Sequence, residues 1–210
     1  MAVREESRAR TREAILAAAR DEIAEYGGGG LSIRRIARTV GLVPSALYRY
    51  APSRDALLTE LIMESYHRLA DRLTVDPVWG EAEAWQHLVD ILRAWAIEAP
   101  HEFQLIYGTP IPGYVAPAET VPAAARVAAP FLAVGARRPV PGFESPDLRT
   151  QMARLEAGDP SGTAAVLAEL AAVVGFLSLE LAGHFVGSAD PADGLFAALT
   201  ARQIGTLQLH

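Results

Sequence analysis

Apolar residues recur along nearly the whole 210-residue chain at the three- and four-residue spacing of an α-helix, in stretches that end at glycine or proline. Residues 8–26 show this pattern first, with Ile15, Ala19 and Ile23 on one face, before a run of four glycines. No stretch shows the alternation of apolar and polar residues that is typical of a half-buried strand. The spacing therefore predicts an all-α protein.

The same periodicity gives about nine helices, several of them short, separated by turns rich in Gly, Pro, Ser and Asp. The stretch from Thr109 to Pro117 holds three prolines and a glycine, so we expect an extended connection there. The ten candidate segments for these helices are residues 8–26, 32–40, 44–50, 54–73, 81–98, 101–108, 118–135, 147–156, 163–186 and 191–209.

Positive charge is concentrated at the start of the chain. Residues 1–54 carry ten Arg and six acidic residues, a balance of +4, whereas residues 55–210 carry nine Arg and nineteen acidic residues, a balance of −10; the two sum to −6. A basic segment attracts nucleic-acid phosphate, although a solvated basic face without a partner gives the same count. We therefore expect two domains, a DNA-binding domain at 1–54 and a larger helical domain at 55–210.

Composition excludes several kinds of chemistry. The chain has no Cys, so disulfides, thiolate nucleophiles and cysteine metal clusters are absent. No phosphate-binding glycine loop, nucleophile elbow or His-Glu-x-x-His motif is present, so we expect neither an enzyme nor a cofactor. The N-terminus alternates charges, and no window of 18 uncharged apolar residues is found, so we expect a cytoplasmic protein without a membrane partner.

Two short predicted helices near residue 41 have the layout of a helix-turn-helix DNA reader. Gly41 supplies the tight turn between them, and the second helix begins at Pro44. A recognition helix must fit a major groove about 12 Å wide, so small side chains belong at its tip. A buried helix pair with solvated arginines is the alternative that this layout alone leaves open. The small residues at the tip are Val43, Pro44, Ser45 and Ala46.

The sequence LSIRRIARTVGLVPSALYRYAPSRDALLTEL resembles the N-terminal module of the TetR family of bacterial transcriptional regulators, and the resemblance covers about residues 11–62. Two positions depart from the family pattern. Ala51 stands where an aromatic residue is usual, and Arg54 stands where Lys is usual, which keeps the charge. The resemblance implies a three-helix DNA reader followed by a helical body that dimerises and binds a small molecule. The matching positions are Ser32, Ile36, Ala37, Gly41, Leu47, Tyr48, Leu57 and Leu58.

Residue type and position within this module give the expected DNA contacts. Hydroxyls and guanidinium groups at both ends of the recognition helix suit phosphates, and these are Ser32, Tyr48, Arg49, Tyr50 and Arg54. Base-edge or groove contacts are expected from Arg34, Arg35, Val43, Pro44, Ser45 and Ala46.

The segments HEFQLIYGTPIPGYVAP and LELAGHF more loosely resemble the C-terminal domain of a subset of these regulators that is common in actinobacteria. We expect a mostly apolar pocket for a small effector in the helical body. An aromatic residue at helical spacing is usually a core residue, so for each candidate taken singly a plain core position is the favoured alternative. Glu180 and His184 have metal-ligand spacing but no third ligand, so no metal site is expected. The expected ligand contacts are Trp85, Trp95, Phe103, Tyr107, Phe131, Phe176 and His184.

The segment 163–186 is apolar nearly all round, so it needs cover on every side. We expect it to pair with the final helix in a two-fold dimer interface that includes Leu177 and Phe196. The sequence thus predicts a homodimeric repressor that a small hydrophobic effector releases from palindromic, double-stranded operator DNA. The alternative is a helical ligand-binding or enzymatic module with a relic reader, and the retained arginines of residues 1–54 favour the regulator.

Overall fold

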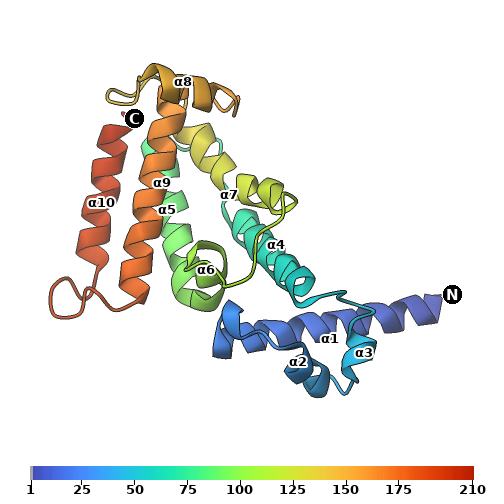
Figure 1. Cartoon of the computed structure of the whole chain (residues 1–210). Coiled ribbons are helices and arrows are strands. Elements are labelled where there is room, and N and C mark those ends of the chain that lie inside the picture. The colour runs from blue at the N-terminus through green and yellow to red at the C-terminus, as the bar shows by residue number, and fades with distance from the viewer. Residues whose placement is uncertain (1) are drawn as a thin grey trace. The chain divides into compact units, whose positions relative to one another are not determined.

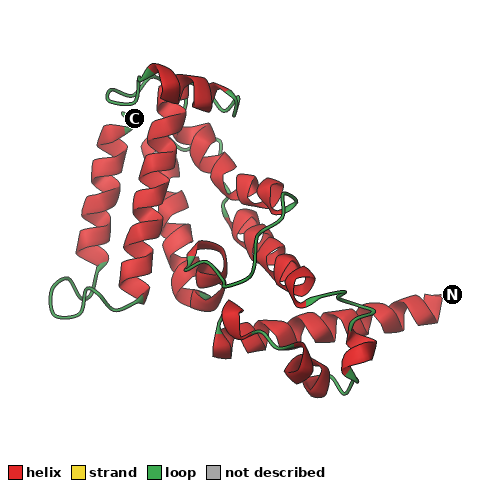
Figure 2. Ribbon diagram, in the orientation of Figure 1, coloured by secondary structure: helices red, strands yellow, loops and turns green. Residues whose placement is uncertain are grey.

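The computed structural model describes the backbone of residues 2–210 and the side chains of residues 5–210 (Figure 1). Ten α-helices and one short 3-10 turn make up the regular structure of these residues, and none of them forms a strand (Figure 2). The all-α fold predicted from apolar spacing is confirmed. Packing divides the chain into two compact units. The first joins the residues up to Tyr66 with His101–Val121, and the second joins His67–Pro100 with Pro122–His210.

The first unit contains the short helices that precede residue 50. Its elements are α1 (Ala2–Tyr26), a 3-10 turn (Gly28–Gly30), α2 (Ile33–Thr39), α3 (Pro44–Leu47), the first part of α4 (Arg54–Arg72) and α6 (Pro100–Tyr107). α1 begins well before residue 8, because its early residues are good helix formers that need no apolar period. α3 ends before residue 50, where the amides of Tyr50 and Ala51 both donate to the Leu47 carbonyl, at 2.8 and 3.1 Å.

Local sequence explains the helix-turn-helix within this unit. The Ser32 hydroxyl caps α2 by accepting a hydrogen bond from the Arg35 amide at 3.4 Å. Gly41 has a φ of 69° in the turn, a value that residues with a side chain rarely adopt. Ala51, in place of the usual aromatic residue, is buried in the core. The buried core of the unit includes Ile15, Leu16, Ala19, Ile23, Leu31, Ile36, Ala37, Leu47, Ala51, Leu57, Leu58 and Leu61.

The second unit contains the longer apolar helices. Its elements are the end of α4, α5 (Glu81–Glu98), most of α7 (Thr120–Gly135), α8 (Pro146–Ala153), α9 (Pro160–Leu181) and α10 (Asp193–Thr206). α9 and α10 lie side by side with α5 against them (Figure 1). Buried polar groups tie these three helices together, because the Trp85 indole donates to the Gln203 side chain at 3.1 Å and the Gln203 amide donates to the Glu169 carbonyl at 2.8 Å.

α9 is strongly apolar, as the sequence predicted. It holds an 18-residue window with a mean hydropathy of 2.0, long and apolar enough by composition to cross a membrane, and 39% of that window is buried within the chain. Every 18-residue window of α9 contains Glu169, so the expectation that no window of 18 uncharged apolar residues exists holds for this helix. The helix does carry the buried Glu169, whose carboxylate pairs with Arg202 at 2.7 Å, as suits a helix that packs within a protein.

The face of α9 and α10 that the chain itself buries is the face that was expected to form the dimer interface. Leu177 and Phe196 are 0% and 3% exposed within the single chain, so the prediction that they lie on a dimer surface was wrong. The outward face of the pair instead carries Leu179 and Leu195, which are 46% and 45% exposed. A helix that is apolar all round gives no indication from sequence of which side its own chain covers.

Candidate DNA-binding surface and ligand pocket

α3 presents small side chains to solvent. Val43 is 64% exposed, Pro44 and Ser45 are exposed, and Ala46 is half-buried. Leu47 is fully buried and anchors the helix to the core formed by α1 and α2. The exposed tip of α3 is therefore narrow, as entry into a DNA groove requires.

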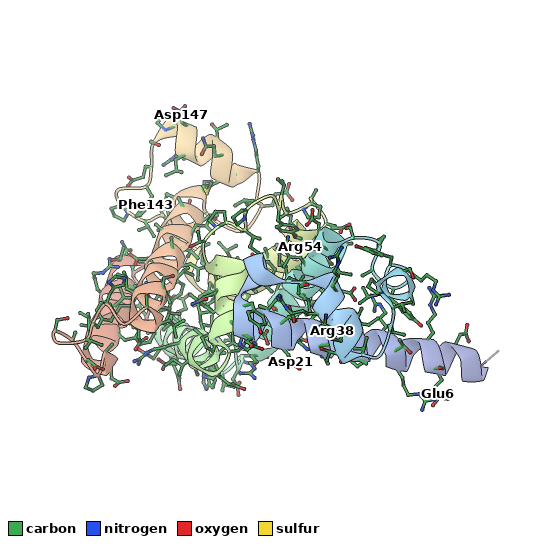
Figure 3. All side chains as sticks on the ribbon, turned by 60° about the horizontal axis from the view of Figure 1, so that its bottom comes forward. Glu6, Asp21, Arg38, Arg54, Phe143 and Asp147 are labelled. Carbon is green, nitrogen blue, oxygen red and sulfur yellow. The ribbon has the colours of Figure 1, made fainter. Side chains whose placement is uncertain are left out.

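Polar and cationic side chains surround this tip. Tyr48 is 49% exposed, Arg49 is exposed and Tyr50 is half-buried just beyond α3. Arg34 and Arg38 are exposed on α2, and Arg38 is labelled in Figure 3. Within the described residues, no carboxylate pairs with Arg34, Arg38 or Arg49. These three guanidinium groups are free to meet phosphates.

Arg35 is held differently. Its guanidinium donates to the buried Glu22 carboxylate at 2.8 Å and to the Gly30 carbonyl at 2.6 Å, and it stacks 4.3 Å from the centre of the Tyr26 ring. The hydrogen bond with Glu22 raises the pKa of Arg35 above its ordinary value. Arg35 thus fastens α2 to α1, because a buried carboxylate needs a partner.

Arg54, labelled in Figure 3, is also held within the chain, although 30% of its side chain is exposed. Its guanidinium donates to the carbonyls of Leu31, Gly28 and Gly29 at 3.1, 2.8 and 3.0 Å. These bonds join the first turn of α4 to the chain between α1 and α2.

The residues that sequence reasoning named as ligand contacts lie in both compact units and do not line one cavity. Trp85, Trp95 and Phe131 belong to the second unit and are fully or nearly fully buried. The Trp85 and Phe131 rings meet edge to face with centroids 5.5 Å apart, which is ordinary core packing. Phe176 is also buried in the second unit, and His184 is exposed there.

Phe103 and Tyr107 lie in the first unit, on α6, with ring centroids 5.4 Å apart. Burial raises the pKa of the Tyr107 hydroxyl, so Tyr107 stays protonated at neutral pH. Neither residue lines the pocket described below. Glu180, weighed as a metal ligand, instead pairs with Arg93 at 2.6 Å.

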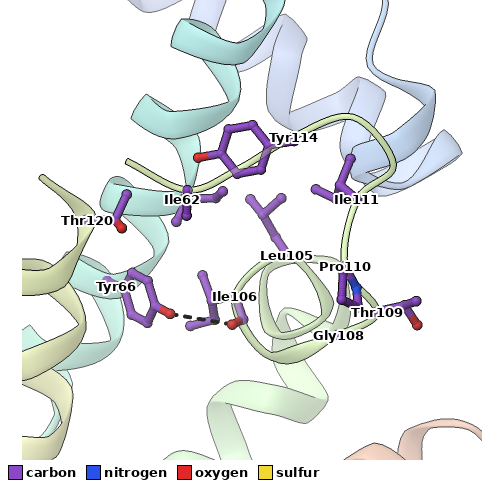
Figure 4. A pocket seen from close by; sticks show the side chains of 11 residues that line it. Ile62, Tyr66, Leu105, Ile106, Gly108, Thr109, Pro110, Ile111, Tyr114 and Thr120 are labelled. Carbon is purple, nitrogen blue, oxygen red and sulfur yellow. Dashed lines mark hydrogen bonds between the residues drawn. The ribbon is translucent and has the colours of Figure 1, made fainter. Parts of the chain in front are cut away.

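The first unit contains a pocket of about 230 Å³ between α4, α6 and the chain that follows α6 (Figure 4). No charged side chain lines it, and its polar groups are hydroxyls and backbone atoms. The Tyr66 hydroxyl donates to the Ile106 carbonyl at 3.4 Å, and the Tyr114 hydroxyl lies 2.9 Å from the Thr59 hydroxyl. The lining residues are Ile62, Tyr66, Leu105, Ile106, Gly108, Thr109, Pro110, Ile111, Tyr114, Ala116 and Thr120.

Sequence reasoning recognised the extended connection at 109–117 but did not recognise it as a pocket wall. The available signal was an aromatic helix followed directly by three prolines and a glycine. Proline prevents such a chain from closing into a helix, so it passes over its neighbours without filling the space beneath it.

Comparisons with known proteins agree with this architecture. The family model described as "Bacterial regulatory proteins, tetR family" matches residues 15–61, and the model "Tetracyclin repressor-like, C-terminal domain" matches residues 85–203. An HTH-type transcriptional regulator of Mycobacterium tuberculosis is 34% identical over 232 residues, which cover 99% of this chain and 96% of the relative. A regulator of the same description from Mycobacterium bovis matches equally well.

Solved structures share the fold over nearly the whole chain. The crystal structure of the protein SCO4313, described as regulatory, has a TM-score of 0.78 and 33% identity, and the match covers 96% of this chain and 98% of that one. A TetR variant from Acinetobacter baumannii in complex with minocycline has a TM-score of 0.55 and 18% identity, with 92% of each chain covered, and this likeness concerns the fold alone.

Proposed function

Because this chain belongs to the TetR family of bacterial transcriptional regulators, we propose that it is a homodimeric repressor, released from a palindromic operator by a small uncharged effector. The observation that carries the proposal is the surface around α3, where small exposed residues are flanked by Arg34, Arg38 and Arg49 without carboxylate partners among the described residues. Such a surface offers the groove a narrow helix and offers phosphates guanidinium groups.

The DNA contacts follow from exposure. Val43, Pro44, Ser45, Ala46 and Arg34 enter the groove and meet base edges. Arg35 and Arg54 contribute mainly by holding α1, α2 and α4 together, since their guanidinium groups are already bonded within the chain. The phosphate contacts of the proposal are Ser32, Tyr48, Arg49 and Tyr50, joined by Arg38.

Two-fold pairing through the outward face of α9 and α10 is the form of dimer that we propose. Leu179 and Leu195 are exposed there, and Gly175 on the same face allows close approach of a second helix. Burial of such a face is favourable, because each apolar Å² removed from water contributes about 25 cal/mol. A two-fold dimer carries two recognition helices, which reach half-sites about 34–36 Å apart.

The pocket of the first unit is the effector site of this proposal. Its lining carries no charge, so an uncharged and mostly apolar compound with one or two hydrogen-bonding groups suits it. Its volume of about 230 Å³ is smaller than that of most drug-binding pockets, which favours a small effector. Because a bacterial regulator must reach DNA, we propose that the protein acts in the cytoplasm.

Selection of binding sites from random double-stranded DNA tests the proposal. The purified protein is expected to enrich an inverted repeat whose two half-sites lie one helical turn apart. A Ser45→Arg variant is the matched comparison, since the exposed tip of α3 would carry a new side chain and should enrich different half-sites. Enrichment of no motif by the wild-type protein would contradict sequence-specific repression, and a single unrepeated half-site would contradict the dimer.

A further inference from the structure

The 3-10 turn after α1 lies directly against the pocket wall. A Cβ atom placed on Gly28 would lie 2.5 Å from Cδ1 of Ile111 and 3.3 Å from Cδ1 of Leu105. Both of these side chains line the pocket (Figure 4). Gly28 therefore lies beside two side chains, Ile111 and Leu105, that also line the cavity.

The backbone of this turn is also hydrogen-bonded to α2 and to the start of α4. Four successive carbonyls, from Gly28 to Leu31, each accept a hydrogen bond from an arginine. Arg54 of α4 donates to Gly28, Gly29 and Leu31, and Arg35 of α2 donates to Gly30. Displacement of this turn would therefore pull on the first residues of α4 and on α2, which precedes the recognition helix.

We propose that the contact between Gly28 and Ile111 transmits occupancy of the pocket to the DNA reader. This inference rests on the proposed function and names the route by which its effector acts. A ligand that packs against Ile111 and Leu105 holds these side chains against Gly28, and the arginine bonds carry the resulting shift to α2 and α4. A side chain at position 28 would occupy the place of the Ile111 terminal methyl group, so Ile111 would have to shift.

Adjacent glycines provide a matched pair of variants. Gly28→Ala places a methyl group against Ile111, whereas a Cβ at Gly29 has no atom within 4 Å. Neither position has the positive φ that would strain an alanine, so both variants are expected to fold. In Gly28→Ala the flexible end of Ile111 must shift, which alters the contact between position 28 and Ile111 that is proposed to carry the coupling.

The experiment measures affinity for the DNA upstream of the protein's own gene, with and without 2-naphthol, an uncharged bicyclic probe with one hydroxyl group. We expect the probe to weaken DNA binding by the wild type and by Gly29→Ala at least fivefold, and to leave Gly28→Ala unchanged. The double variant Gly28→Ala/Ile111→Val removes the colliding Cδ1 atom and is expected to regain most of the response. This rescue distinguishes coupling from a general loss of structure.

The outcomes separate the inference from the proposed function. Wild-type protein that fails to bind the upstream DNA would overturn the repressor itself. Wild type that binds the DNA but ignores 2-naphthol would overturn the pocket as the site that controls it. Equal responses of Gly28→Ala and Gly29→Ala, or no rescue by Ile111→Val, would overturn the route through Gly28 while leaving the repressor intact.

Discussion

The arginines near the recognition helix divide into two groups by their contacts. Arg35 and Arg54 donate to backbone carbonyls of residues 28–31, whereas Arg34, Arg38 and Arg49 are exposed and pair with no carboxylate of the described chain. Identical side chains therefore serve different purposes a few residues apart. We propose that the first group positions the helix-turn-helix and that the second group supplies positive charge for DNA.

Replacement of one member of each group should separate stability from binding. Arg54→Ala removes two part-buried hydrogen bonds and one exposed hydrogen bond to backbone carbonyls, so we expect a loss of about 1–3 kcal/mol in the free energy of unfolding. Arg49→Ala removes an exposed charge and should leave thermal unfolding unchanged while weakening binding to all DNA sequences alike. Calorimetry and DNA titration of both variants check this; equal melting temperatures for the two would show that the Arg54 bonds contribute nothing.

Residue identity predicted the location of the reader better than it predicted individual contacts. At the tip of α3, Val43, Pro44 and Ser45 are exposed, whereas Ala46 is half-buried; of the flanking hydroxyls, that of Tyr48 belongs to an exposed side chain and that of Tyr50 to a half-buried one. The roles of Arg35 and Arg54 depend on Glu22 and on carbonyls that only the folded chain brings near, so neither spacing nor composition reveals them. Trp85 illustrates the same difficulty, because a large aromatic residue at helical spacing has the same pattern in a core and in a pocket.

At the scale of helices, the ends of elements follow from their sequence. Asp159 caps α9, and its carboxylate accepts hydrogen bonds from the amides of Ser161 and Gly162 at 2.9 and 3.1 Å and from the Ser161 hydroxyl at 2.6 Å. These bonds lower the pKa of Asp159 from its ordinary value of 3.8. The ionised carboxylate is therefore favoured in the folded state.

Removal of this cap should have a measurable and pH-dependent cost. Asp159→Ala is expected to lower the free energy of unfolding by about 1 kcal/mol at neutral pH. Because the folded pKa is depressed, the charge-dependent part of the stabilisation is present above pH 3.8 and is lost as the pH falls through the folded pKa. Asp159→Asn, which keeps an accepting oxygen, is the control. A cost of Asp159→Ala that grows toward acid pH would contradict this assignment.

The outward face of α9 leads to a second prediction at this scale. Leu179→Arg places a charge on a surface exposed in the single chain, so we expect a folded monomer with weakened operator binding. Leu177→Arg buries the charge in the core and should unfold the protein instead. Val78→Arg, at a site that is 84% exposed outside α9 and α10, should remain a dimer. Light scattering that finds Leu179→Arg still dimeric would place the interface elsewhere.

Helical periodicity predicted where most helices lie, but not which face of α9 the chain covers. Nine of its first ten positions after Pro160 carry apolar or small side chains, so the pattern has no preferred direction. Only the packing of α5 and α10 against α9 decides that Leu177 lies inside and Leu179 lies outside.

At the scale of the molecule, the helix-turn-helix and a ligand-sized pocket belong to the same compact unit. Residues 101–121 supply part of the pocket and pack against the core that includes α1, α2 and α3. The sequence division at residue 54 concerns charge and function and remains a prediction. It does not reveal that a later segment returns to the reader, because such a contact between distant residues leaves no periodic signal.

A salt titration tests whether the exposed arginines and hydroxyls around α3 bind operator DNA. Fluorescence anisotropy would measure the affinity of the wild-type protein for labelled DNA from upstream of its gene, between 50 and 200 mM salt, beside scrambled DNA of the same length. We predict tighter binding to the upstream DNA by about a thousandfold, with log affinity falling linearly with log salt by roughly 0.9 per neutralised phosphate. Affinity that does not change with salt would contradict phosphate binding by these side chains, and equal affinity for both DNA sequences would contradict sequence-specific binding.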